Sequence, residues 1–321
     1  MTASAPYLDE PSLGAAAKFR LFGAAVSVNH LSEPPYTHIL NSQFTSITPE
    51  VEMKWDATEP APGSFSFDAA DTLVRYAHSH HMRVRGHTLV WHTALPSWVN
   101  ESADLLQAMR NHIIGVMQHY TGHISYWDVV NEAFDEDGSR RKSIFQERIG
   151  DLHIEEAFRV ARATDPYTRL CYNDYGIEGI NAKSDAVYDL VRDFKRRGIP
   201  LDCVGFQCHL LLGTVPPDMQ TNLQRFADLG VEIHITELDI RMPVPASTAE
   251  LQQQAEDYRK VIQACLAIPH CTSITTWGIT DKYSWVPGTF PGYGAALLFD
   301  ENYKKKPAYH AVLQALREAP E

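Results

Sequence analysis

Short apolar runs alternate with amphipathic stretches from one end of the chain to the other, and this alternation constrains the possible folds most strongly. The runs are rich in Val and Ile and lack strict polar alternation, which is typical of strands buried on both faces. Eight segments have this character, at residues 21–28, 43–48, 83–88, 125–130, 169–172, 203–207, 232–236 and 273–278.

The segments between these runs carry helix signals. Apolar residues recur at spacings of three and four from Leu105 to Tyr120, which places one apolar stripe on a helix. Ser247 and Glu250 have the spacing of a capping box at the start of another helix, and Pro269 lies beyond the expected end of that helix.

Eight strand–helix units predict an α/β fold, a closed parallel (β/α)8 TIM barrel, because parallel neighbours need crossover helices. A doubly wound open sheet is the alternative, but it usually has fewer strands and often a Gly-rich first turn, which this chain lacks. Neither a low-complexity linker nor a shift in composition divides the 321 residues. We therefore expect residues 1–321 to form a single barrel domain.

The chain is acidic, with a formal net charge of −12 at pH 7. This balance argues against nucleic acid and anionic membranes as partners, since both would require a basic face. No apolar run approaches the ~20 residues needed to cross a bilayer. The charge suits a neutral or weakly charged partner such as a polysaccharide.

The five cysteines bear on the compartment in which the protein works. Cys265 and Cys271 lie close in sequence across a bend that contains a proline, and Cys171 and Cys203 lie on two neighbouring predicted strands. Two such pairs would favour an oxidising compartment, whereas five buried thiols in an intracellular enzyme are the alternative. The first residues, MTASAPYLDEPSL, lack the basic start and apolar core of a signal peptide. We expect a secreted protein whose leader is absent from this sequence, with an intracellular protein as the alternative.

Polar and aromatic residues follow nearly every strand candidate. In a barrel of this kind, chemistry takes place where the strands end, on the loops that lead to the helices. A purely structural explanation would bury several carboxylates without a function, which is energetically costly. The strand-end residues are Glu50, Lys54, His87, Trp91, His92, Asn131, Glu132, Asn173, Asp174, Gln207, His209, Glu237, Asp239 and Trp277.

Three kinds of chemistry could use these residues. A sugar-phosphate enzyme would need a phosphate cradle after the last strands, but the glycines at 288, 292 and 294 are interleaved with aromatic residues that suit sugar rings better. A metal-dependent enzyme is the second possibility, with the candidate ligands Glu132, His209, Glu237 and Asp239. Glycoside hydrolysis needs two carboxylates flanking a bond, aromatic platforms and polar donors along a cleft, and the chain supplies all of these.

Seven sequence motifs resemble those of glycoside hydrolase family 10. WDVVNEA (127–133) and ITELDI (235–240) are similar to the family's acid/base and nucleophile motifs. The other five are MKWDATEP (53–60), RGHTLVWH (85–92), LCYNDY (170–175), VGFQCH (204–209) and TTWGITDKYSW (275–285). All seven occur in the family's order along essentially the whole chain.

The resemblance implies a retaining endo-β-1,4-xylanase that cuts internal β-1,4 bonds of xylan on a (β/α)8 barrel. Residues 1–321 would then be a single catalytic domain without a carbohydrate-binding module. No cofactor and no metal are expected, the expected partner is xylan or a xylo-oligosaccharide, and the expected state is a monomer.

The resemblance also implies roles for individual residues. Glu132 would be the general acid/base and Glu237 the nucleophile. Asn131 would bind the sugar hydroxyl next to the reacting carbon, and His209, backed by Asp239, would hold Glu237 in place. The substrate-binding residues would be Glu50, Lys54, His87, Trp91, Asn173, Gln207, Trp277 and Trp285.

These roles require the two glutamates to differ in charge. Glu237 must be ionised to attack, so a donor such as His209 should lower its pKa. Glu132 must arrive protonated, and the nearby charge of Glu237 should favour its neutral form. A retaining mechanism also requires carboxyl groups about 5–5.5 Å apart, so the fourth and seventh predicted strands should face each other across the barrel mouth.

Two positions depart from the family pattern. Val51 stands where an Asn usually hydrogen-bonds a sugar on the glycone side, so the alternatives are a related β-1,4-glycanase or glycosidase on another substrate, or a non-catalytic carbohydrate-binding barrel. Cys208 stands where Ser is frequent, and we expect it to be a small buried residue without effect. The pairings Cys171–Cys203 and Cys265–Cys271 match disulfides common in a branch of the family that is typically secreted.

Overall fold

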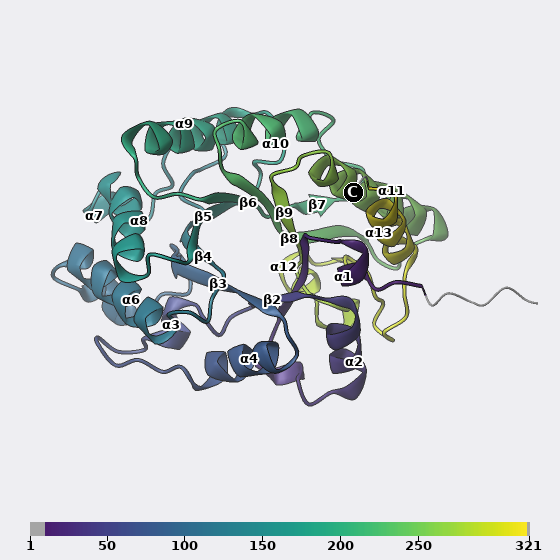
Figure 1. Ribbon diagram of the computed structural model, residues 1–321, viewed down its shortest axis with the longest axis horizontal. Coiled ribbons are helices and arrows are strands. Elements are labelled where there is room, and N and C mark those ends of the chain that lie inside the picture. The colour runs from purple at the N-terminus through teal and green to yellow at the C-terminus, as the bar shows by residue number, and fades with distance from the viewer. Residues whose placement is uncertain (1–9, 320–321) are drawn as a thin grey trace, which may run out of the picture.

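A ring of eight parallel strands forms the centre of the computed structural model, which describes residues 10–319 (Figure 1). These strands are β1 (Leu21–Val26), β2 (Ser46–Pro49), β3 (Arg83–Val90), β4 (Tyr126–Asn131), β5 (Arg169–Asp174), β6 (Cys203–Phe206), β8 (Glu232–Pro243) and β9 (Cys271–Thr276). Neighbours pair in this order, and the ring closes because β9 pairs with both β8 and β1. The prediction of a (β/α)8 barrel is confirmed.

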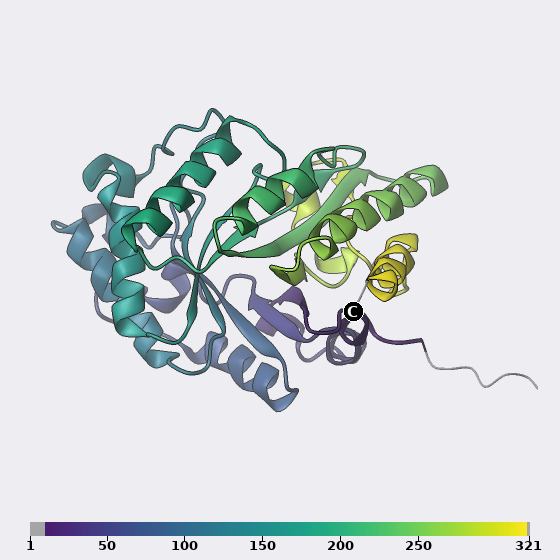
Figure 2. The same ribbon diagram turned by 45° about the horizontal axis from the view of Figure 1, so that its top comes forward.

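Helices follow the barrel strands and form a layer outside them, which the tilted view makes plain (Figure 2). Two short strands, β7 (His209–Leu211) and β10 (Tyr293–Gly294), pair with the part of β8 that runs beyond the ring. The helices, including the 3-10 turns η1 and η2, are α1 (Leu13–Ala16), η1 (Val28–His30), α2 (Pro34–Gln43), α3 (Trp55–Thr58), α4 (Asp68–Ser79), α5 (Ser97–Glu101), α6 (Leu105–His119), α7 (Ile144–Arg148), α8 (Leu152–Thr164), α9 (Ala182–Arg197), α10 (Met219–Ala227), α11 (Thr248–Leu266), η2 (Asp281–Tyr283), α12 (Val286–Thr289) and α13 (Pro307–Glu318).

Local sequence signals account for these helices. The predicted capping box is present at the start of α11, where the Ser247 side chain accepts from the Glu250 amide and the Glu250 side chain accepts from Ser247. The stripe predicted from Leu105 to Tyr120 is the buried face of α6. Helices α1 and α13 pack together beside α11, so the two ends of the described chain meet on one side of the barrel (Figure 1).

The eight predicted strands are all present, although several boundaries differ. The second strand begins at Ser46 rather than at residue 43, because α2 continues through Gln43. The seventh runs to Pro243 rather than ending at 236, because its outer half pairs with β7 and β10. Among the described residues, no helix is long and apolar enough to cross a membrane. The expectation of a missing leader rests largely on residues 1–9, which lie outside the described residues.

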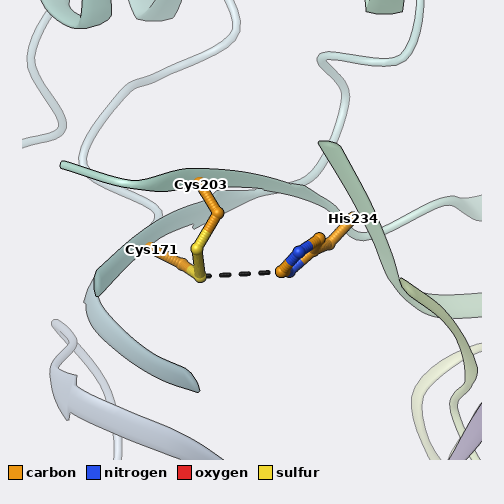
Figure 3. Close-up of side chains that lie close together, drawn as sticks. All are labelled: Cys171, Cys203 and His234. Carbon is orange, nitrogen blue, oxygen red and sulfur yellow. Dashed lines mark hydrogen bonds between the residues drawn. A yellow bond between two sulfur atoms is a disulfide. The ribbon is translucent and has the colours of Figure 1, made fainter. Parts of the chain in front are cut away.

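Both expected cysteine pairs lie at bonding distance. Cys171 and Cys203 are register partners on β5 and β6, with Cα atoms 4.5 Å apart (Figure 3). Cys265 in α11 joins Cys271 at the start of β9. Cys208 is a free thiol and is buried, as expected.

Candidate active site

One cavity of about 620 Å³ opens where the barrel strands end. Most of its walls come from residues at or just beyond the carboxyl ends of β2, β3, β4, β6, β8 and β9. The lining residues are Glu50, Val51, Lys54, His87, Trp91, Asn131, Glu132, Tyr175, Gln207, His209, Glu237, Arg241, Trp277, Trp285 and Phe290. The polar residues predicted at the strand ends therefore largely gather around a single site.

Glu132 and Glu237 enter this cavity from different strands and are joined through two buried amides. Asn173 Nδ2 donates to Glu237 Oε1 and to Asn131 Oδ1, both at 2.8 Å. Asn131 Nδ2 donates to Glu132 Oε1 at 3.2 Å, and Gln207 Nε2 donates to the same oxygen at 3.0 Å. The two carboxyl groups are thus fixed relative to one another by a short chain of hydrogen bonds.

A glycine on the next strand makes room for the central amide of this chain. Asn173 on β5 lies opposite Gly205 on β6, and a Cβ atom at Gly205 would lie 2.2 Å from Asn173 Oδ1. The same oxygen accepts from Thr236 Oγ1 at 2.7 Å. Only glycine allows the backbone of β6 to approach the Asn173 side chain this closely.

His209 bridges Glu237 to a second carboxylate. Its Nε2 lies 2.9 Å from Glu237 Oε2 and its Nδ1 lies 3.0 Å from Asp239 Oδ1. Burial opposes protonation of His209, but the charges of Asp239 and Glu237 outweigh it and raise the pKa of His209 to about 10. The imidazolium therefore donates to both carboxylates at neutral pH.

Glu237 is held in its ionised form. Burial favours the neutral carboxyl, but the hydrogen bond from His209, the charge of His87 and the hydrogen bond from Asn173 together lower the pKa of Glu237 below its usual value. The predicted direction of this shift is confirmed.

Glu132 has an unusual backbone conformation, with a φ of 59°. A residue other than glycine rarely adopts this left-handed region, and such strain persists where surrounding contacts hold it. The Glu132 amide donates to the Asn173 carbonyl at 2.9 Å, and Trp91 Nε1 donates to Glu132 Oε2 at 2.9 Å. Together with the amide contacts to Oε1, these bonds direct the carboxyl group into the cavity.

The remaining walls combine aromatic rings with charged groups. Burial raises the pKa of Glu50 to about 7 against the opposing charge of Lys54. Lys54 Nζ lies 4.9 Å from the centre of the Trp91 ring. His87 Nδ1 contacts the buried carboxylate of Asp128 at 2.9 Å, which fixes the orientation of the imidazole toward the cavity.

The structure brings nearly all of the predicted site residues together, with one difference in placement. Asn173, which was expected to bind substrate, is fully buried beneath the carboxylates and contacts them instead. Asp239 is fully buried behind His209, as expected, and it also accepts from Trp285 Nε1 at 2.7 Å.

Three lining residues were missed as site residues by sequence reasoning. They are Tyr175, Arg241 and Phe290. Tyr175 is the last residue of the LCYNDY motif, and Arg241 directly follows the ITELDI motif, so both could have been found from the motifs. Phe290 is one of the aromatic residues interleaved with the glycines at 288, 292 and 294. Val51, the departure from the family pattern, lines the cavity and is 48% exposed.

Within residues 10–319, one group of side chains has the spacing of metal ligands. Cys171, Cys203 and His234 lie close together, with the Cys171 sulfur 3.9 Å from His234 Nδ1 (Figure 3). Both sulfurs are committed to the disulfide, and Arg85 Nη1 lies 2.9 Å from His234 Nδ1. A cation would have to displace this guanidinium contact and break the disulfide, so these residues do not suit a metal.

A barrel whose mouth holds two joined carboxyl groups among indole rings is typical of enzymes that hydrolyse glycosidic bonds. The family model for glycosyl hydrolase family 10 matches residues 12–315. An endo-1,4-beta-xylanase from Agaricus bisporus is 46% identical over 313 residues, covering 96% of this chain and 94% of the relative. The chain belongs to glycosyl hydrolase family 10.

Solved structures agree with this assignment. A glycosylated endo-beta-1,4-xylanase from Gloeophyllum trabeum is 45% identical with a TM-score of 0.94, covering 96% of this chain and 99% of that one. Xylanase 10B from Thermotoga petrophila, solved with xylobiose, is 41% identical with a TM-score of 0.94, covering 97% and 99%.

Proposed function

We propose that this protein is a retaining endo-1,4-β-xylanase in which Glu237 is the nucleophile and Glu132 the general acid/base. The observation that carries the proposal is the pair of carboxyl groups in one cavity, joined through Asn131 and Asn173, with Glu237 held ionised. The names of the relatives and the xylobiose complex of the Thermotoga enzyme support a xylo-oligosaccharide as substrate.

In the first step, Glu237 attacks the anomeric carbon while Glu132 transfers its proton to the departing glycosidic oxygen. This leaves a glycosyl ester on Glu237 and an ionised Glu132. In the second step, Glu132 takes a proton from water, the resulting hydroxyl forms the new bond at the anomeric carbon, and Glu237 leaves as a carboxylate. His209 donates to Glu237 Oε2, so it stabilises the charge that disappears in the first step and returns in the second.

The cavity walls fit a sugar chain rather than a small polar ligand. Trp91, Trp277 and Trp285 offer apolar faces, and Glu50, Lys54 and Gln207 offer hydrogen-bonding groups. Val51 offers no such group, and this favours a second candidate, a β-1,4-glycanase or glycosidase with another preferred sugar. The family match over residues 12–315 supports a single catalytic domain, and we propose that this domain acts as a monomer.

The two disulfides support action in an oxidising compartment outside the cell. We therefore propose that the protein is secreted.

The test is NMR analysis of the first products formed from xylan, cellulose and a mixed β-glucan. We expect cleavage of xylan, with the β-anomer of the new reducing end appearing before mutarotation. The Glu237→Gln variant should bind xylo-oligosaccharides without cleaving them. First formation of the α-anomer would contradict retention, and hydrolysis of the glucans alone would contradict xylan as substrate.

A further inference from the structure

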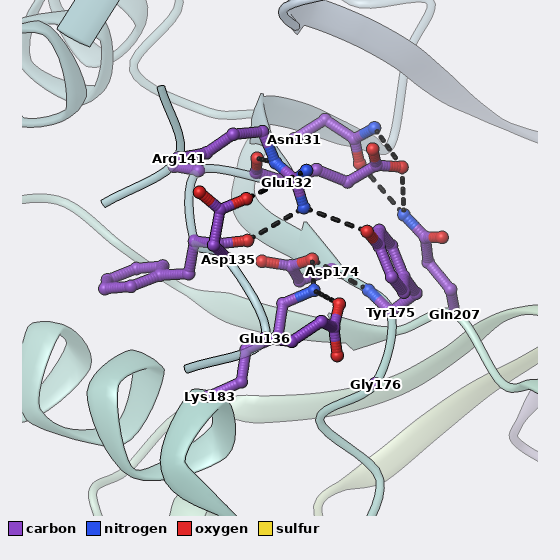
Figure 4. A network of polar contacts seen from close by, with 12 residues as sticks. Asn131, Glu132, Asp135, Glu136, Arg141, Asp174, Tyr175, Gly176, Lys183 and Gln207 are labelled. Carbon is purple, nitrogen blue, oxygen red and sulfur yellow. Dashed lines mark hydrogen bonds and ion pairs between the residues drawn. The ribbon is translucent and has the colours of Figure 1, made fainter. Parts of the chain in front are cut away.

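Arg141 contacts the loop that follows β4 and carries Glu132 (Figure 4). Its Nε donates to the Glu132 carbonyl at 2.7 Å, and its Nη2 donates to the Phe134 carbonyl at 2.8 Å and to the Tyr175 hydroxyl at 3.0 Å. Its Nη1 lies 3.2 Å from Asp135 Oδ1. All three nitrogens of one guanidinium are therefore used, and the side chain is only 16% exposed.

The Glu132 carbonyl oxygen is the atom at which Arg141 restrains the strained backbone of Glu132. With a φ of 59°, Glu132 would relax toward an ordinary conformation if its flanking peptide groups were free. The amide on one side is bound by the Asn173 carbonyl, and the carbonyl on the other side is bound by Arg141. The cavity-facing contacts of the carboxyl group do not restrain this carbonyl.

Tyr175 is restrained by the same guanidinium and by a second cation. Lys183 Nζ lies 3.5 Å from the centre of the Tyr175 ring, and it pairs with the fully buried Asp174 at 3.1 Å. Arg141 fixes the hydroxyl at the far end of the same ring. The tyrosine, which lines the cavity with Glu132, is therefore held at both its face and its tip.

We infer that Arg141 is a positioning residue that fixes the Glu132 backbone and the Tyr175 ring as one rigid unit, and that proton delivery to the leaving group depends on it. The inference rests on the proposed function, in which Glu132 protonates the departing oxygen. A shift of about 1 Å in a catalytic group costs up to about 100-fold in rate. The loss should fall on substrates that need a proton, because activated leaving groups depart without one.

The experiment compares kcat/KM for xylohexaose and for a 2,4-dinitrophenyl β-xylobioside in the Arg141→Lys variant. Lysine keeps the positive charge but lacks the planar set of donors with which the guanidinium reaches the Glu132 carbonyl, the Phe134 carbonyl and the Tyr175 hydroxyl together. We expect a loss of about tenfold or more on xylohexaose and of about threefold or less on the activated glycoside.

The neighbouring arginine provides a matched control. Arg140 packs over Phe134 and pairs with Asp151, and no hydrogen bond joins its side chain to the Glu132 carbonyl. Arg140→Lys should leave the ratio of the two kcat/KM values as in the wild type. An equal loss on both substrates in Arg141→Lys, or no loss on either, would overturn the inference.

A second variant keeps the inference testable if Arg141→Lys does not fold. Tyr175→Phe removes one acceptor of the guanidinium and leaves its charge, so it should shift the same ratio in the same direction by a smaller factor. An unchanged ratio in a folded Tyr175→Phe protein would then count against the inference. Failure of the wild type to cleave either substrate would instead overturn the proposed function.

Discussion

The charge of Glu237 depends on a residue that does not reach the cavity. Asp239 is fully buried and accepts from His209 Nδ1, and this contact keeps His209 protonated toward Glu237. The proposed nucleophile is therefore prepared through a relay of two side chains.

Asp239→Asn should move the acid limb of kcat/KM to higher pH. Without the Asp239 charge, the pKa of His209 falls from about 10, its donation to Glu237 weakens and the pKa of Glu237 rises. Activity requires ionised Glu237, so it is lost as the pH falls through that pKa. We expect a shift on the order of one pH unit, since a hydrogen bond to a charged group is worth about 1.5–3 kcal/mol.

The measurement is kcat/KM for a xylo-oligosaccharide from about pH 3 to about pH 9, the range in which carboxyl and imidazole groups titrate. Asp137→Asn removes a carboxylate from the exposed loop after Glu132 and should leave the acid limb in place. An acid limb that stays fixed in Asp239→Asn would show that Asp239 does not control Glu237.

Sequence reasoning found the polar residues of the site because they follow recognisable strands, but it misplaced Asn173. The Asn173 side chain lies beneath the carboxylates because Gly205 on the neighbouring strand leaves space for it. Such a contact depends on the register between two strands, which no local pattern in either one encodes.

Strands and helices were predictable where the apolar residues within them recur at a regular spacing or form a short run. The eight barrel strands and the cap of α11 follow from local sequence, because burial and capping act within a few residues. Strands β7 and β10 have three and two residues, too few for any period. They exist because the long β8 projects beyond the ring and offers its edge to them.

The disulfides tie neighbouring elements across loops of different length. Cys171–Cys203 joins β5 to β6 with a sequence separation of 32, and Cys265–Cys271 joins α11 to β9 with a separation of 6. The loop-entropy model assigns about 4 kcal/mol to the first and about 2 kcal/mol to the second. Replacing both cysteines of a pair by alanine should therefore lower Tm more for the first pair.

Thermal unfolding followed by calorimetry measures this difference. Cys208→Ala is the matched control, because this buried cysteine closes no loop and reports the cost of lost packing alone. Equal decreases in Tm for the two double variants, after that correction, would contradict the loop-length explanation.

The barrel as a whole brings together residues that lie far apart in the chain. Glu132 and Glu237 are more than 100 positions apart, and they meet in one cavity because β9 pairs with both β8 and β1 and closes the ring. Their meeting was predictable from the strand count, since the ends of parallel strands share one rim. The hydrogen bonds that join them were not.

The central claim is that Glu237 forms a covalent bond to the sugar, and trapping this species tests it most directly. A 2-deoxy-2-fluoro-β-xylobioside with a dinitrophenyl leaving group should add one glycosyl unit to the protein, because the fluorine slows breakdown of the ester more than its activated formation. Mass spectrometry of the peptides should place that unit on Glu237. A label on any other residue, or turnover of xylan without any trapped adduct, would contradict the account.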